Sequence, residues 1–261
     1  MTADDAALLA ALPHWAFGFV LVLGRVGGAM MLLPGIGEAD LPVRIRAGMA
    51  LALTLLLISV VLPDGPPQPD GVWQDAAALA AEIAVGLWLG WLARLLTFAL
   101  EMAADFLSVM IGLTSILLPN PGAGAASSEM SRILGLAATV LVLASGLYAQ
   151  PLTALAGSYA LLPLGGHGLS GADLAQTALR GLGQSFSLAL RLAAPFVFAG
   201  TVWQLALAVL SRLVPRLQVY FLALPAQVLG GLALIAALST ALLAAWQTAA
   251  QAGFASLPGG L

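Results

Sequence analysis

Ionisable side chains inside apolar segments are the residues of this chain whose type and spacing could do chemistry. Arg94, Glu101 and Asp105 stand at positions i, i+7 and i+11 of one apolar run, so an α-helix places them on one stripe. Such a stripe can line an aqueous path or form a proton relay, or it can form an ion-paired seam against a neighbouring helix. We favour the seam, because charges of both signs are present and can neutralise each other.

Three more ionisable residues lie inside apolar segments, namely Arg25, Glu82 and Arg191. Glu82 lies about 100° around the helix from Glu101, so we expect it to face a different neighbour, and Arg25 and Arg191 leave the same two interpretations open. His14 and His167 have no second His, Asp or Glu at ligand spacing, so no metal site is expected. No nucleophile triad, phosphate-binding loop or paired-carboxylate site is found. The pattern therefore predicts no catalytic residue and no enzymatic activity.

The elements that carry these charges are those of a membrane protein. The chain has 261 residues, of which 61% are hydrophobic and 8% charged, and its mean hydropathy is +1.02. Average domains carry roughly 25% charged residues. Nucleic-acid binding is not expected, because there is no Lys and the nine basic residues are scattered arginines. Composition thus predicts a polytopic integral membrane protein.

About six hydrophobic helical segments are predicted, each compared with the roughly 20 apolar residues that a spanning helix needs. They are Trp15–Leu33, Ala47–Leu62, Ala76–Leu118, Ile133–Ala172 with breaks at Pro151 and Pro163, Ser185–Leu213, and Val219–Trp246. Pro195 and Pro225 fall inside the last two and are predicted to break and bend those helices. Gly24/Gly28 and Gly86/Gly90 form two Gly-x-x-x-Gly patterns, which we interpret as close helix packing rather than a dimer face. The predicted fold class is all-α.

The segment "GLTSILLPNPGAGAASSEMSR", from Gly112 to Arg132, interrupts this apolar chain. Its prolines and glycines oppose a regular helix, and it lacks the charges of an ordinary solvated loop. Non-helical backbone at membrane depth is tolerated only where protein buries it or where it lines water. The residues therefore predict a multi-helix assembly with an internal segment that lines or closes a path, and a transporter or a channel component would both fit.

Read in order, several motifs resemble the FliR family, the export-gate subunits of flagellar and virulence-type type III secretion systems. The N-terminal match is "RVGGAMMLLPGIGEADLPVRIRAGMALALTLLL", and "EIAVGLWLGWLARLL" is similar to the family's Glu-Ile-x-x-Gly-x-x-x-Gly segment. "GLTSILLPNP" resembles the family's central loop, with Asn120-Pro121 in place of Asp-Pro. The later matches are "SYALLPLG", "LRLAAPFV" and "VPRLQVYFLALPAQVLGG". The resemblance covers nearly the whole chain.

The resemblance implies a non-enzymatic subunit without a cofactor, in the bacterial inner membrane at the base of a flagellum or injectisome. It implies a single domain of bent helical hairpins, with a FliP-like part over residues 1–180 and a FliQ-like part over residues 181–261. It also implies assembly with FliP-like and FliQ-like subunits, with FlhB-like and FlhA-like proteins nearby, into a conduit for unfolded substrates. The central loop would be a plug that closes this conduit, built from Gly112, Leu113, Ile116, Leu117, Leu118, Pro119, Asn120, Pro121, Gly122 and Gly124. Arg25, Glu82, Arg94, Glu101, Asp105 and Arg191 would then be covered by partner subunits rather than by lipid.

Three alternatives stay open at this point. A stand-alone secondary transporter or channel would place a midplane site at the broken helices. A purely structural assembly factor would differ from a gate only in whether the loop touches substrate. The loop itself could be a plain connecting turn, although such turns usually have 2–8 residues.

Overall fold

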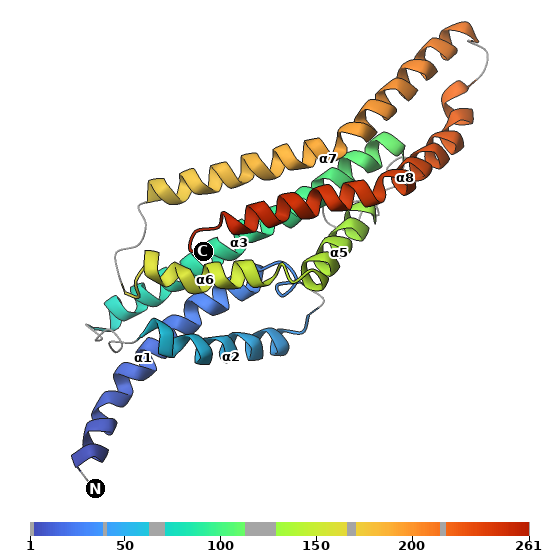
Figure 1. Ribbon diagram of the computed structural model, residues 1–261. Coiled ribbons are helices and arrows are strands. Elements are labelled where there is room, and N and C mark those ends of the chain that lie inside the picture. Colours follow the sequence, from blue (N-terminus) through green and yellow to red (C-terminus); the bar gives the residue numbers. More distant parts are fainter. Residues whose placement is uncertain are drawn as a thin grey trace. The chain divides into compact units, whose positions relative to one another are not determined.

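The computed structural model describes residues 3–38, 41–62, 71–112, 129–165, 171–214 and 218–260. These residues form helices and short connections, with no β-strand in any of the described ranges. The helices are α1 (Ala3–Leu32), α2 (Val43–Val61), α3 (Val72–Ile111), α5 (Glu129–Ala144), α6 (Ala149–Leu161), α7 (Gly171–Leu213) and α8 (Val219–Ala255), as Figure 1 shows. The predicted all-α class is confirmed.

The number of membrane-length helices also agrees with the prediction. Within the described residues, five helices are long and apolar enough to cross a membrane, and the bent pair of α5 and α6 brings the number to six. α5 and α6 meet at an angle of 70°. The chain is thus built as a multi-pass membrane protein.

The break between α5 and α6 lies at residues 145–148, whereas the sequence suggested Pro151. Pro151 is the third residue of α6, where a backbone N–H has no intrahelical partner and a proline is tolerated. The turn instead contains Gly146 at φ +74°, a left-handed conformation that glycine adopts without steric cost. Pro163 does follow the end of α6, as predicted.

Pro195 and Pro225 lie inside α7 and α8, and both helices continue through them. The prediction that these prolines break their helices is therefore wrong, and a local bend at either one stays a prediction. A proline removes one N–H donor and crowds the carbonyl four residues earlier. The long helical runs on both sides tolerate that local loss.

The chain forms two compact units. The first contains Met1–Leu95, Val142–Leu179 and Ala252–Leu261, and the second contains Leu96–Leu141 and Arg180–Gln251. The first unit therefore holds α1, α2, α6 and the beginning of α3. The second holds the end of α3 with most of α5, α7 and α8. The division at residue 180 into two family-like parts is a separate matter and stays a prediction.

The two Gly-x-x-x-Gly patterns pack against each other inside the first unit. A Cβ atom added at Gly86 of α3 would overlap the Arg25 carbonyl oxygen, and one at Gly28 of α1 would come within 2.7 Å of the Ile83 carbonyl oxygen. One at Gly90 would come equally close to the Ala29 carbonyl oxygen. Only glycine lets the two backbones approach this closely, which agrees with the packing interpretation of these motifs.

Candidate functional site

A buried ion pair joins α1 to α3 where their glycines meet. Arg25 lies between the two glycines of α1, and Glu82 lies one turn before Gly86 of α3. The Arg25 Nε donates to Glu82 Oε2 at 2.6 Å. Arg25 is 1% exposed and Glu82 is 4% exposed. The close helix crossing thus places two full charges in contact within the core of the first unit.

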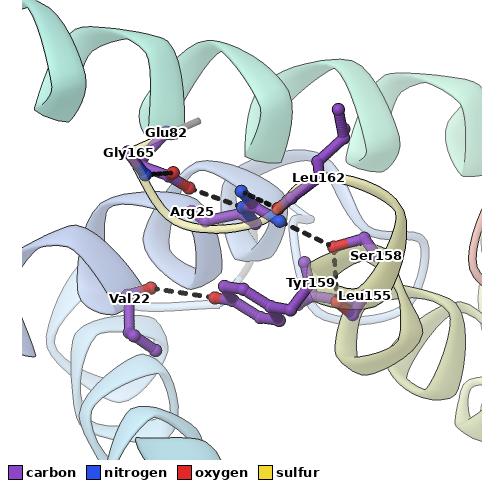
Figure 2. Close-up of polar contacts among 8 residues, drawn as sticks. All are labelled: Val22, Arg25, Glu82, Leu155, Ser158, Tyr159, Leu162 and Gly165. Carbon is purple, nitrogen blue, oxygen red and sulfur yellow. Dashed lines mark hydrogen bonds and ion pairs between the residues drawn. The ribbon is translucent and has the colours of Figure 1, made fainter. Parts of the chain in front are cut away.

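The guanidinium of Arg25 also holds the end of α6 (Figure 2). Its Nη2 donates to the Leu162 carbonyl at 2.9 Å, and its Nη1 donates to Ser158 Oγ at 3.3 Å. The Leu162 carbonyl follows the last residue of α6, where helix carbonyls lack intrahelical partners. The other carboxylate oxygen of Glu82 accepts the backbone N–H of Gly165 at 3.4 Å.

An aromatic ring completes this cluster. The Arg25 guanidinium carbon lies 4.2 Å from the centroid of the Tyr159 ring, within the range of a cation–π interaction. The Tyr159 hydroxyl donates to the Val22 carbonyl at 3.4 Å. We call Arg25, Glu82, Ser158, Tyr159 and the Leu162 carbonyl the arginine cluster. Its charges are neutralised and hydrogen-bonded by neighbours from three helices, which is the arrangement of a structural link rather than of a proton relay.

Arg94, the first residue of the predicted stripe, forms an ion pair with a residue outside α3. Its Nη2 lies 3.0 Å from Glu38 Oε2, and its Nη1 donates to Glu38 Oε1 at 3.4 Å. Glu38 follows α1, and both side chains are about four-fifths buried. The pair is therefore a bidentate ion pair between α3 and the α1–α2 connection inside the first unit.

The other members of the stripe belong to the second unit. Glu101 is half-buried, its carbonyl accepts the Ser131 hydroxyl at 3.2 Å, and its carboxylate packs against Gly135 of α5. Asp105 is exposed, and so is Arg191 of α7. The ion-paired seam along Arg94, Glu101 and Asp105 stays a prediction, to which the structure adds Glu38 as an ion-pair partner of Arg94.

Gly112 is the only predicted plug residue inside the described ranges. The other nine, namely Leu113, Ile116, Leu117, Leu118, Pro119, Asn120, Pro121, Gly122 and Gly124, lie outside them. Gly112 has φ +81° and directly follows α3, as a C′ glycine does at a helix end. Beside it, the Gln227 Nε2 of α8 donates to the Met110 carbonyl at 2.9 Å. The root of the loop is therefore tied to α8 within the second unit.

Four of these residues were missed by the sequence reasoning, namely Glu38, Ser158, Tyr159 and Gln227. A usable signal existed for two of them, because Ser158 and Tyr159 stand just before Pro163, which ends a helix and leaves carbonyls needing donors. Gln227 is one of three glutamines in α8, so residue type alone did not single it out. Glu38 lies in the connection after α1, and helical periodicity gives no signal for a residue outside a helix.

Comparisons with known proteins indicate the family of the chain. The family described as bacterial export proteins, family 1, matches residues 16–253. The chain is 32% identical over 216 residues to the flagellar biosynthetic protein FliR of Caulobacter vibrioides, covering 83% of this chain and 86% of that protein. It is 26% identical over 227 residues to FliR of Escherichia coli, covering 86% and 85%. It is also 26% identical over 209 residues to the Yop proteins translocation protein T of Yersinia pestis, covering 79% and 80%.

Proposed function

The chain belongs to the bacterial export proteins, family 1, and from this premise we propose that it is an export-gate subunit of a type III secretion system. Its relatives are export-apparatus proteins rather than enzymes. We propose flagellar export in particular. The observation that carries this is the 32% identity to a flagellar protein along most of both chains. In this role the subunit forms a conduit with FliP-like and FliQ-like partners, through which unfolded substrates cross the bacterial inner membrane.

Assembly with partner subunits is supported by how little of the apolar surface the chain covers by itself. In the most apolar stretch of α8 only 6% is buried, and in that of α2 only 11%. Exposed ionisable residues, Asp105 and Arg191, lie on membrane-length helices. A charge in lipid costs a few kcal/mol on insertion scales, so protein or water must cover these positions. FliP-like and FliQ-like subunits, with FlhB-like and FlhA-like proteins nearby, would provide that cover.

Expression with and without these partners tests the assembly. We expect the chain alone to aggregate after detergent extraction and to become monodisperse when it is produced together with FliP-like and FliQ-like proteins, with which it should co-purify. A soluble protein of similar expression level in the same cells controls for general toxicity. A heat-stable, monodisperse monomer in detergent would contradict the proposal and favour a stand-alone transporter.

The second part of the proposal is that Gly112–Ser128 is the plug that closes the conduit at rest. The sequence supports this: its glycines permit several backbone conformations, and its prolines oppose a helix. Its alanines present little bulk to a passing chain. Ile116, Leu117 and Leu118 can exclude water when they pack against partner side chains.

Two variants of the loop separate a plug from a connector. Shortening Pro119–Ser127 makes the loop too short to extend across the conduit. Changing Ile116, Leu117 and Leu118 to serine keeps the length of the loop and removes the apolar side chains that would exclude water. We expect both complexes to assemble and both idle membranes to leak ions and small solutes, measured with a potential-sensitive dye. If both variants assemble, stay tight and export at the normal rate, the loop is only a connector.

A further inference from the structure

The outward face of α7 in the second unit carries a row of polar residues. Arg180, Gln184, Ser187 and Arg191 stand at positions i, i+4, i+7 and i+11, so helical periodicity places them within about 60° of one another. Arg180, Gln184 and Arg191 are exposed, and Ser187 is half-buried. We call these four residues the α7 stripe.

The opposite side of α7 packs against the chain itself. Its buried residues in this stretch are Ser185, Ala189, Leu192, Ala193 and Phe196. They lie roughly 120–220° around the helix from Arg180, so the stripe faces away from the core of the second unit. Neither Arg180 nor Arg191 forms an ion pair within the described ranges. The stripe therefore presents two positive charges that the described part of the chain does not neutralise.

Lipid is a poor cover for this stripe. An arginine in the hydrocarbon region is costly, and the headgroup layer on each side of a bilayer is only about 5–8 Å thick. Eleven residues separate Arg180 from Arg191, which is roughly 16 Å along the helix axis. A helix that crosses the bilayer steeply cannot place both arginines in one headgroup layer, so lipid phosphates do not neutralise both charges.

Water alone is also a poor cover, because large apolar side chains are exposed beside the stripe and beyond it. Phe186 and Leu190 flank the arginines and are 51% and 45% exposed. Past Arg191 the same face of α7 continues with Phe198 and Val202, which are 73% and 51% exposed. A face that combines arginine with exposed aromatic and aliphatic side chains has the composition of a protein interface.

We propose that the α7 stripe is the docking surface for a helix of a partner subunit that carries two carboxylates about three turns apart. One carboxylate faces Arg180 and the other faces Arg191, and apolar side chains further along the same partner helix cover Phe198. Two helices that pack at about 20° stay in contact over this distance, so the partner needs the same spacing as the arginines. This inference rests on the proposed assembly with partner subunits and adds the chemistry of one of its contacts.

Arginine suits this contact better than an ordinary solvated charge would. Its guanidinium binds a carboxylate through two parallel hydrogen bonds and is more weakly hydrated than the ammonium of lysine. Placing a like charge opposite such a group disfavours the wrong partner. The stripe can thus select an acidic helix and set its register along α7.

Three double substitutions in the co-expressed complex test the charge of the stripe. Arg180→Glu with Arg191→Glu reverses the charge, Arg180→Gln with Arg191→Gln removes it, and Arg180→Lys with Arg191→Lys keeps it. The control is Arg132→Glu, at an arginine of α5 whose side chain is 67% exposed. Assembly is measured as the amount of complex that co-purifies in detergent at a fixed level of this chain.

We expect the reversed stripe to lower the recovered complex by at least about tenfold, because like charges then face each other across the interface. The lysine stripe should lower it by less than about threefold, with the glutamine stripe between the two, and the control should resemble the unchanged protein. Equal recovery with the reversed and the lysine stripes overturns the inference, whether both assemble or both fail.

A photo-crosslinking amino acid at Gln184, between the two arginines, identifies what covers the stripe without changing its charge. We expect the product to be a peptide of a partner subunit with two acidic residues about eleven positions apart. Changing those two acids to lysine should restore the recovery of the reversed stripe. A product with lipid, with an exported substrate or with a partner segment that lacks such acids overturns the inference, and so does the absence of any product.

Failure of the proposed assembly gives a different result. If the unchanged chain does not co-purify with FliP-like and FliQ-like subunits, the assembly is refuted and this inference with it. If the unchanged complex forms and all three stripe variants are recovered at the same level, the assembly stands and only the acidic partner helix is refuted.

Discussion

Replacing Arg25 by methionine is the most direct test of what the arginine cluster contributes. The change keeps most of the side-chain volume and removes the guanidinium, so Glu82, which is 4% exposed, loses its partner at 2.6 Å. Breaking a buried ion pair on one side costs about 3–5 kcal/mol. At 1.4 kcal/mol per factor of ten, the ratio of folded to unfolded protein falls by roughly a hundredfold or more.

The double variant Arg25→Met with Glu82→Leu isolates the cost of the unpaired carboxylate. In both variants the Leu162 carbonyl loses its donor at 2.9 Å, which costs about 1–3 kcal/mol. Only the single variant also keeps an uncompensated charge in the core. We therefore expect the double variant to be more stable than the single one, as is found when apolar residues replace whole buried ion pairs.

The assay is the temperature at which half of the complex, extracted in detergent, loses monodispersity. A change of 1 kcal/mol shifts such a midpoint by about 2–4 °C in chains of this size, so Arg25→Met should lower it by roughly 6–20 °C. Arg132→Met, at an arginine whose side chain is 67% exposed, is the control and should shift it little, because exposed ion pairs contribute little to stability. If Arg25→Met matches this control, or if the double variant is worse than the single one, the ion pair does not hold the three helices together.

Three further changes can be measured by the same midpoint. Gly86→Ala should lower stability by about 1–3 kcal/mol, because its methyl group would overlap the α1 backbone. The methyl group of Gly27→Ala would meet nothing within 4 Å, so this control should be neutral or stabilising by up to about 1 kcal/mol. Equal effects of the two variants would refute the packing argument. Arg94→Met should cost less than Arg25→Met, about 1.5–3 kcal/mol, because Glu38 retains access to water; a larger loss would mean that further groups depend on Arg94. Trp246→Phe removes a donor that lies 2.9 Å from an α3 carbonyl and should cost about 1 kcal/mol plus the cavity that it leaves; no change would mean that the indole N–H contributes nothing.

The sequence determined the fold class and the kind of protein because those properties depend on composition and local period. An apolar fraction of 61% with 8% charge leaves helices as the economical way to satisfy the backbone in lipid. Glycines one turn apart indicated close helix packing for the same reason, since a small-residue face is a property of one helix alone, but that the two faces meet is shown only by the structure. The ordered motifs indicated the family along nearly the whole chain.

Only the tertiary structure decided which charges meet. Arg25 and Glu82 are 57 residues apart, and Arg25 and the Leu162 carbonyl are 137 apart. Helical periodicity places a side chain on a face of its own helix, but it does not say which helix will lie against that face. For this reason the sequence grouped Arg94 with Glu101 and Asp105, whereas the structure pairs Arg94 with Glu38. Pro195 and Pro225 show the same limit, because the helices around them continue where local propensity alone predicted a break.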